Sequence, residues 1–279
     1  MPVIKLSDEI KTGYSGYKKL IQFYSECREF TNETISIDFY DLMWIDANLC
    51  ALFEAILYKL GSENKLVFSY DDVFVRSKFD VLFRNGFLKT GEIIEDIQKS
   101  TMPAQFFTWD NKDDFLKYIE EKLFGHRGMP KLTQDLSEKI SDDLIEIFCN
   151  SNHHANTKHP FFVAGQYYPN QKLLRFTMVD LGDGFLPRIK AATNGAIEND
   201  LMAIQWAIAG NSSKIILDKT PGALGIKSIL RYCEENGGEL DIISGNGYWS
   251  STYANTIFKE GRELEIKFVG TTINLTFQH

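Results

Sequence analysis

The chain has 279 residues, a formal net charge of -8, and 44% hydrophobic and 13% aromatic residues. This length accommodates one large domain or two ordinary ones with packed cores. The acidic balance argues against a general binder of nucleic acid or anionic membranes, because such binding depends on clustered Lys and Arg. Charges near the N-terminus argue against a signal peptide, and no apolar run approaches roughly eighteen residues, so we expect a cytoplasmic protein without membrane spans.

The four cysteines, Cys27, Cys50, Cys149 and Cys233, are far apart in the sequence and form no C-x-x-C pair. Zinc sites and redox motifs need closely spaced cysteines, so neither is indicated. We expect buried free thiols.

The N-terminal part alternates strand and helix patterns. Residues 35–39 alternate apolar and polar side chains, and a helix-like run extends over 47–60 before Gly61. Residues 65–70 predict a buried strand, and 73–85 have apolar residues near helical spacing. Strand, helix, strand and helix in this order predict parallel strand pairing.

The pattern of this part, in residues 37–39, 44–49, 65–67 and 82–88, resembles a STAS domain, the fold of bacterial anti-sigma-factor antagonists. In that family an Asp precedes a phosphorylatable Ser at the start of a helix, where free N–H groups and the helix dipole favour an anion. Here Asp46 precedes Ala47, which has no hydroxyl. The resemblance implies a degenerate STAS-like domain that has lost its phosphate acceptor. An unrelated α/β layer is the alternative.

A charged segment, residues 89–103, is broken by Gly91 and Pro103 and is the best candidate for a domain boundary. We therefore expect a STAS-like α/β domain over 1–100 and a second domain over 101–279.

The second part begins with a strand pattern at 104–109 and a helix pattern at 113–123. A longer helix follows, and on it Glu146 and Asn150 lie together beside the apolar face because they are four residues apart. Residues 161–168 and 173–180 then predict a hairpin that places Asp180 at a strand end.

The remaining segments predict further helices and strands. Helix patterns lie at 203–209 and 226–236, with a polar segment between them, and strand patterns lie at 239–244, 253–258 and 270–277. Helices on one face of a mixed sheet are the natural packing for this order of elements.

Four short motifs in this part resemble, in their order, the GHKL or Bergerat-fold ATPase domain of gyrase B, MutL, histidine kinases and anti-sigma-factor serine kinases. They are an E-x-x-x-N helix (Glu146, Asn150), D-x-G-x-G (Asp180, Gly182, Gly184), a Gly-rich turn entering a helix (Gly222, Gly225) and a strand that opens with Gly270 and Thr271. Each motif alone is weak, whereas four in order are specific.

The chemistry of these residue types suits ATP and Mg²⁺. The carboxamide oxygen of Asn150 can complete the shell of a magnesium ion held largely by phosphates, and this is the metal-ligand position of the family. Glu146 can accept a proton from a water or serine hydroxyl in line with the terminal phosphate. Asp180 is an acceptor-only carboxylate that matches the exocyclic amine of adenine.

The resemblance implies roles for the other motif residues as well. Backbone N–H groups beside glycine can bind phosphates at a helix start, and glycine lets the backbone approach the base closely. The residues concerned are Gly182 and Gly184 at adenine, Gly222 and Gly225 at the phosphates, Thr271 as a hydroxyl near adenine, His154 at a common family position close to the site, and Lys214 in a lid where it could meet a phosphate.

Simpler interpretations stay open for the single motifs. Glu146 and Asn150 alone fit a solvated helix edge, and D-x-G-x-G alone fits a turn or part of a calcium loop that lacks its later ligands. Zinc binding is disfavoured because His153 and His154 are adjacent and point apart on a helix.

The motifs predict an ATP-binding protein, either a slow magnesium-dependent ATPase or a serine kinase that acts on a protein partner such as a separate STAS-type protein. The alternative is a non-catalytic switch in which ATP gates partner binding. A sensor histidine kinase is disfavoured, because the one histidine before His153 is His126, which lies in a glycine-flanked loop. A homodimer is compatible with this prediction.

Overall fold

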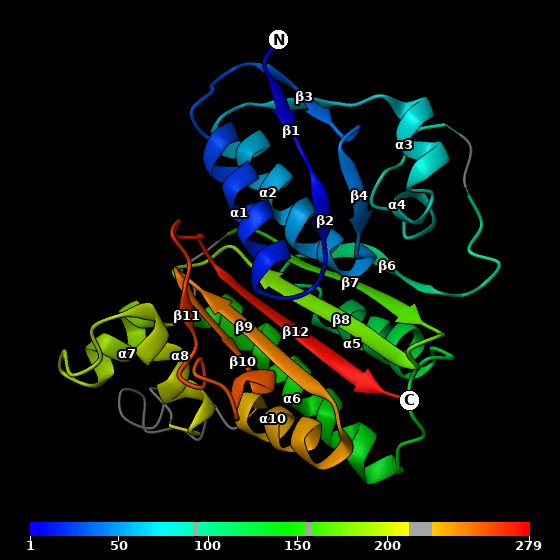
Figure 1. Cartoon of the computed structure of the whole chain (residues 1–279). Helices are drawn as coiled ribbons and strands as arrows, with labels where there is room; N and C mark the ends of the chain where they lie inside the picture. The colour runs from blue at the N-terminus through cyan, green and yellow to red at the C-terminus, as the bar shows by residue number, and fades with distance from the viewer. Residues whose placement is uncertain (92–93, 155–157, 212–224) are drawn as a thin grey trace.

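The computed structural model describes residues 1–91, 94–154, 158–211 and 225–279, and only the backbone of residues 152–154. The chain has a small N-terminal α/β part and a seven-stranded sheet, and helices lie on both faces of that sheet (Figure 1). None of the helices in these ranges is long and apolar enough to cross a membrane.

The strands of the N-terminal part pair in parallel, as the sequence predicts. Strands β1 (Val3–Lys5), β3 (Thr34–Asp38) and β5 (Val67–Ser69) form one sheet, and β2 (Asp8–Ile10) pairs with β4 (Leu42–Ile45). The prediction that β5 is buried is wrong, since β5 is an edge strand and its Val67 is 61% exposed.

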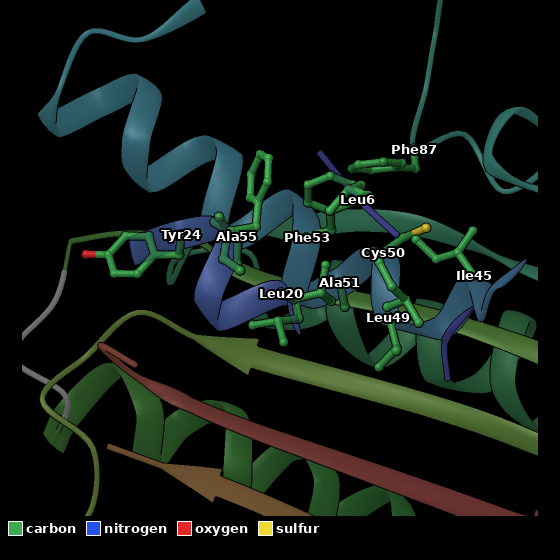
Figure 2. Packing of buried hydrophobic residues seen from close by; sticks show 14 of the residues in the cluster. Leu6, Leu20, Tyr24, Ile45, Leu49, Cys50, Ala51, Phe53, Ala55 and Phe87 are labelled. Carbon is green, nitrogen blue, oxygen red and sulfur yellow. The ribbon is translucent and has the colours of Figure 1, made fainter. Parts of the chain in front are cut away.

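The helices of this part share one apolar core. Helix α1 (Tyr14–Cys27) packs beside α2 (Cys50–Glu63), which follows a short 3-10 turn, η1 (Ala47–Leu49). The predicted helix over 73–85 is two short helices, α3 (Asp72–Lys78) and α4 (Val81–Arg84), because the backbone leaves the helical region at Phe79. Figure 2 shows Leu20 of α1 and Leu49, the last residue of η1, lying over the strands of the large sheet.

The large sheet is antiparallel in every pair of described strands, so the prediction of a mixed sheet is wrong. The strands β8 and β9, which helices connect, run in the same direction, but β12 lies between them and opposes both. No parallel pair therefore forms among these strands. The order is β11 (Arg262–Glu263), β10 (Gly247–Ser250), β9 (Glu239–Ser244), β12 (Thr271–Gln278), β8 (Leu173–Asp180), β7 (Phe161–Tyr168) and β6 (Thr101–Phe107).

Several predicted elements of this part are confirmed. The hairpin of β7 and β8 forms, and the helix predicted at 226–236 is α10 (Gly225–Asn236), which ends before Gly237 in the left-handed region. The predicted strand at 253–258 is wrong: a 3-10 turn, η3, occupies Ser251–Tyr253, and the preceding β10 takes the pairing position instead.

Helices α5, α6 and α10 cover one face of the sheet (Figure 1). Helix α5 (Lys112–Tyr118) continues into a π-helical turn, η2 (Ile119–Phe124), and its Phe115 stacks on Phe148 of α6 with ring centroids 4.8 Å apart. Helix α6 spans Gln134–His154, and helices α7 (Leu186–Ala192) and α8 (Asp200–Ile208) lie beside the sheet.

The N-terminal part covers the opposite face of the sheet. The sequence predicted helices on one face only, and this second layer was not predicted. Successive residues of a strand point to opposite faces. In β8, Phe176 and Met178 join the core under α5, α6 and α10, whereas Val179 joins the core of α1 and α2. All four cysteines are free thiols. Cys27, Cys50 and Cys233 are buried as predicted, and Cys149 is partly exposed.

A buried polar seam joins the two parts where η1 meets the middle of the sheet. Arg175 Nη1 lies 2.9 Å from Asp46 Oδ2, and Asn48 Nδ2 donates to Thr177 Oγ1 at 2.9 Å. The backbone N–H of Ala47 donates to Gln166 Oε1. We define the polar seam as Asp46, Ala47, Asn48, Gln166, Arg175, Thr177 and Asn274.

The polar seam can be tested through its ion pair. Replacing Arg175 with Leu leaves the Asp46 carboxylate, whose side chain is 2% exposed, without its cation. We expect the free energy of unfolding of the whole chain, measured in urea, to fall by about 3 kcal/mol. Arg231→Leu is the control, because Arg231 pairs with Glu235 at the surface, and there we expect a change of ~0.5 kcal/mol. Equal losses in the two variants would contradict the seam's role.

Candidate nucleotide site

Helix α6 holds Glu146 and Asn150 one turn apart on the face that borders the core. Asn150 Nδ2 donates to Glu146 Oε1 at 3.3 Å, so the amide is oriented by the carboxylate one turn before it. Asn150 Oδ1 is buried and has no hydrogen-bond partner among the described residues. An unpaired carboxamide oxygen is a suitable ligand for a hard cation such as Mg²⁺.

The site would supply few protein ligands to such a cation. Among the described residues, no cluster of three or more His, Cys, Asp or Glu side chains could hold a metal ion. Magnesium commonly keeps waters and binds through one or two protein groups and the phosphates of a substrate. The buried Oδ1 of Asn150 is a group that such an ion could use beside its waters.

Asp180 ends β8 on the same side of the sheet as α6. Its Oδ1 accepts the backbone N–H of Gly182 at 2.9 Å, and its Oδ2 accepts the hydroxyl of Ser151, which follows Asn150 on α6, at 3.3 Å. Thr271 of β12 is its direct partner in the strand register. This arrangement brings the predicted motifs Glu146–Asn150, Asp180–Gly182 and Thr271 into one region.

Burial dominates the electrostatics of Asp180, which is 6% exposed. Burial raises the pKa of this carboxyl to about 6, against the lowering effect of hydrogen bonds from Gly182, Ser151 and Thr271. The donors keep the ionised form accessible near neutral pH. A buried carboxylate of this kind can accept a hydrogen bond from an amine of a base.

Two glycines of the motifs are required by close packing. Gly270 has φ +122°, and a Cβ atom there would lie 2.0 Å from the carbonyl oxygen of Asp180. Gly184 has φ +75°, and its Cβ atom would lie 2.7 Å from Ser244 Oγ, which accepts the N–H of Phe185. The backbone at both ends of the Asp180 turn thus fits only glycine without strain.

The first turn of α10 lies directly on α6. A Cβ atom on Gly225 would be 3.1 Å from the carbonyl oxygen of Asp143 and 3.3 Å from Glu146 Oε2. The N–H groups of a first helical turn have no partners within the helix and attract anions. Gly225 therefore brings the N-terminal end of α10 against the Glu146 carboxylate.

The remaining predicted residues are described only in part. Lys214 and Gly222 lie outside the described residues, and His154 is the last residue of α6, with only its backbone described. Sequence reasoning missed Ser151 and Asp143. The sequence indicates these two residues only by their positions: Ser151 follows Asn150, and Asp143 precedes Glu146 by one helical turn.

No family model matches the chain, and searches of the curated proteins and of the solved structures found no match either.

Asp180→Asn tests whether burial of the ionised Asp180 carboxylate destabilises the folded chain. The pKa of Asp180 is about 6 in the folded chain and near 3.8 when unfolded. Ionisation of Asp180 therefore lowers the free energy of unfolding progressively from about pH 4 to about pH 6, and by a constant amount above that. Asn also loses one acceptor for the donors around Asp180, a cost that does not depend on pH. We therefore expect the stability of the variant relative to the natural chain to rise by about 2 kcal/mol from pH 4 to pH 7.

Urea unfolding at a series of pH values measures this difference. Asp183→Asn is the matched control, since Asp183 is exposed in the same turn and should change the unfolding free energy by no more than ~0.5 kcal/mol at any pH. A stability difference between Asp180→Asn and the natural chain that stays the same from pH 4 to pH 7 would contradict this account.

Proposed function

We propose that the chain is an ATP-binding protein of GHKL, or Bergerat-fold, type with an attached degenerate STAS-like part. One observation carries the proposal: the register of β8 and β12 sets Asp180 opposite Thr271, while Ser151 ties Asp180 to the helix that bears Glu146 and Asn150. Motifs separated by more than a hundred residues thus meet at one end of the sheet.

Each group has a distinct task under this proposal. Asp180 accepts the exocyclic amine of adenine, and the first turn of α10 receives the phosphates. Asn150 Oδ1 would bind magnesium, which neutralises charge on the phosphates when it is present. Glu146 is the general base in the catalytic form of the proposal, where it removes a proton from a water or a serine hydroxyl.

The attached STAS-like part bears on what could be phosphorylated. Its Asp46 and Ala47 are buried in the polar seam, on the face of the sheet opposite α6 and α10. Ala47 has no hydroxyl, and its backbone N–H at the start of η1 already donates to Gln166 Oε1. A serine substrate would therefore belong to a separate chain, which favours regulation of a partner, such as a STAS-type protein, over modification of the attached part.

A non-catalytic switch is the second candidate function. Glu146 accepts a hydrogen bond from Asn150 with one oxygen and lies beside the start of α10 with the other. Such contacts position Asn150 and α10, and they need no proton transfer. In this case nucleotide binding changes the arrangement of α6 and α10, and the difference in partner affinity between the two states supplies the switch.

Asp180→Asn also tests adenine binding. The carboxamide can direct an N–H group at the adenine amine, and we expect ATP affinity, measured by calorimetry with Mg²⁺, to fall about tenfold to hundredfold. Asp183→Asn should bind ATP like the natural chain. Full retention of ATP affinity in Asp180→Asn would overturn the site assignment, and the urea measurements show whether a variant that loses affinity is still folded.

Glu146→Gln separates the enzyme from the switch. The amide cannot act as a base but still offers an oxygen to Asn150 Nδ2. For an enzyme we expect phosphate release or phosphotransfer to fall about 10²-fold to 10⁴-fold with ATP affinity nearly unchanged. Partner regulation by ATP that survives in this variant supports the switch.

A further inference from the structure

A second buried carboxyl lies on the site face of α6 and has no role in the function proposed above. Asp143 precedes Glu146 by three residues, and its side chain is almost fully buried, with 9% of the residue exposed. Its Oδ2 has no hydrogen-bond partner among the described residues. An unpaired buried carboxylate oxygen costs free energy and calls for an explanation.

The first turn of α10 packs against this carboxyl. A Cβ atom on Gly225 would lie 3.6 Å from the Cα atom of Asp143, and the hydroxyl of Ser228, one turn further along α10, stabilises the ionised form of Asp143. The turn expected to receive phosphates is therefore the one that Asp143 faces.

The charge around Asp143 is mostly negative. On its own helix the charged neighbours are Lys139, Asp142 and Glu146, and from the described part of α10 the polar neighbour is the Ser228 hydroxyl. Burial raises the pKa of Asp143 to about 6, Ser228 and Lys139 oppose this shift, and Glu146 and Asp142 add to it. Asp143 is thus mainly ionised at neutral pH, yet a small further repulsion would protonate it.

We propose that Asp143 is a proton-linked positioning residue, which takes up a proton from solvent when the phosphates of a nucleotide bind at the first turn of α10. This inference rests on the proposed function. Phosphates at Gly225 would add negative charge beside a buried carboxylate, and like charges at short range in a buried site disfavour ionisation strongly. The neutral carboxyl removes the repulsion and keeps its contact with Ser228. The proton returns to solvent when the nucleotide leaves.

The inference predicts that nucleotide affinity depends on pH through Asp143. Since proton uptake accompanies binding, Asp143 disfavours ATP increasingly as pH rises above about 6. Asp143→Asn is neutral at every pH, so we expect it to bind ATP with Mg²⁺ about threefold to tenfold more tightly than the natural chain at pH 7.5 and about equally at pH 5.5. A carboxyl that only supports the fold would not change affinity in this pH-dependent way.

Calorimetry in two buffers with different ionisation enthalpies counts the protons taken up with ATP. The natural chain and Asp135→Asn, whose altered side chain is exposed in the first turn of the same helix, should take up the same fraction of a proton at pH 7, and Asp143→Asn should lose that uptake. Ser228→Ala provides a second route, because it removes the group that favours the ionised form and should reduce the uptake.

The outcomes separate the two proposals. Undiminished proton uptake in Asp143→Asn, together with normal ATP binding, would overturn the role of Asp143 and leave the nucleotide site intact. Absence of ATP binding by the natural chain at any pH would instead overturn the proposed function, and this inference with it.

Discussion

The register between β8 and β12 is the constraint on which the rest of the structure depends. It pairs Asp180 with Thr271 and continues in step to Leu173 and Gln278, along the full length of both strands. Gly270 allows the close approach at the Asp180 end, where a larger residue would meet the carbonyl oxygen of Asp180. A shift of β8 by one residue would exchange its two faces. Asp180 would then point away from α6, and the apolar residues Phe176 and Met178 would point into the polar seam.

The same register also defines the surface that receives the N-terminal part. Thr177 and Asn274, neighbours in the paired strands, hydrogen-bond to each other at 2.9 Å and to Asn48. Asn274 in turn donates to Asp241 of β9 at 3.1 Å. Polar groups buried in the middle of a sheet are tolerable only when they are paired. Asn48 of η1 supplies this pairing, and η1 thereby becomes part of the sheet's packing.

The parts of the fold that were predictable from sequence are those set by local patterns. The hairpin of β7 and β8, the helix that carries Glu146 and Asn150, and the helix of residues 225–236 follow from alternation, helical spacing and glycine stops. The placement of β12 between β8 and β9 was not predictable, because nothing local marks a strand that pairs with a segment as distant in the sequence as β8.

The candidate site shows the same division. The order of the motifs was visible in the sequence, whereas the contact of Ser151 with Asp180 depends on how α6 lies on the sheet. The sequence shows that Ala47 has no hydroxyl. It does not show that Ala47 is buried with its backbone N–H bonded to Gln166 Oε1. Residue types were thus readable from the sequence, whereas contacts between distant segments required the packing of the sheet.

The two buried carboxyls of the site have the same pKa, about 6, for different reasons, and their surroundings give them different tasks. Asp180 has donors from Gly182, Ser151 and Thr271, which oppose the effect of complete burial and keep a carboxylate in place to accept a hydrogen bond. Asp143 is less deeply buried but has one hydroxyl, an unpaired oxygen and acidic neighbours. A charge that is held by donors suits recognition of an amine, whereas a charge with few donors is readily given up when another anion arrives. The sheet and α6 thus place two buried carboxyls with different hydrogen-bond surroundings close to the same helix.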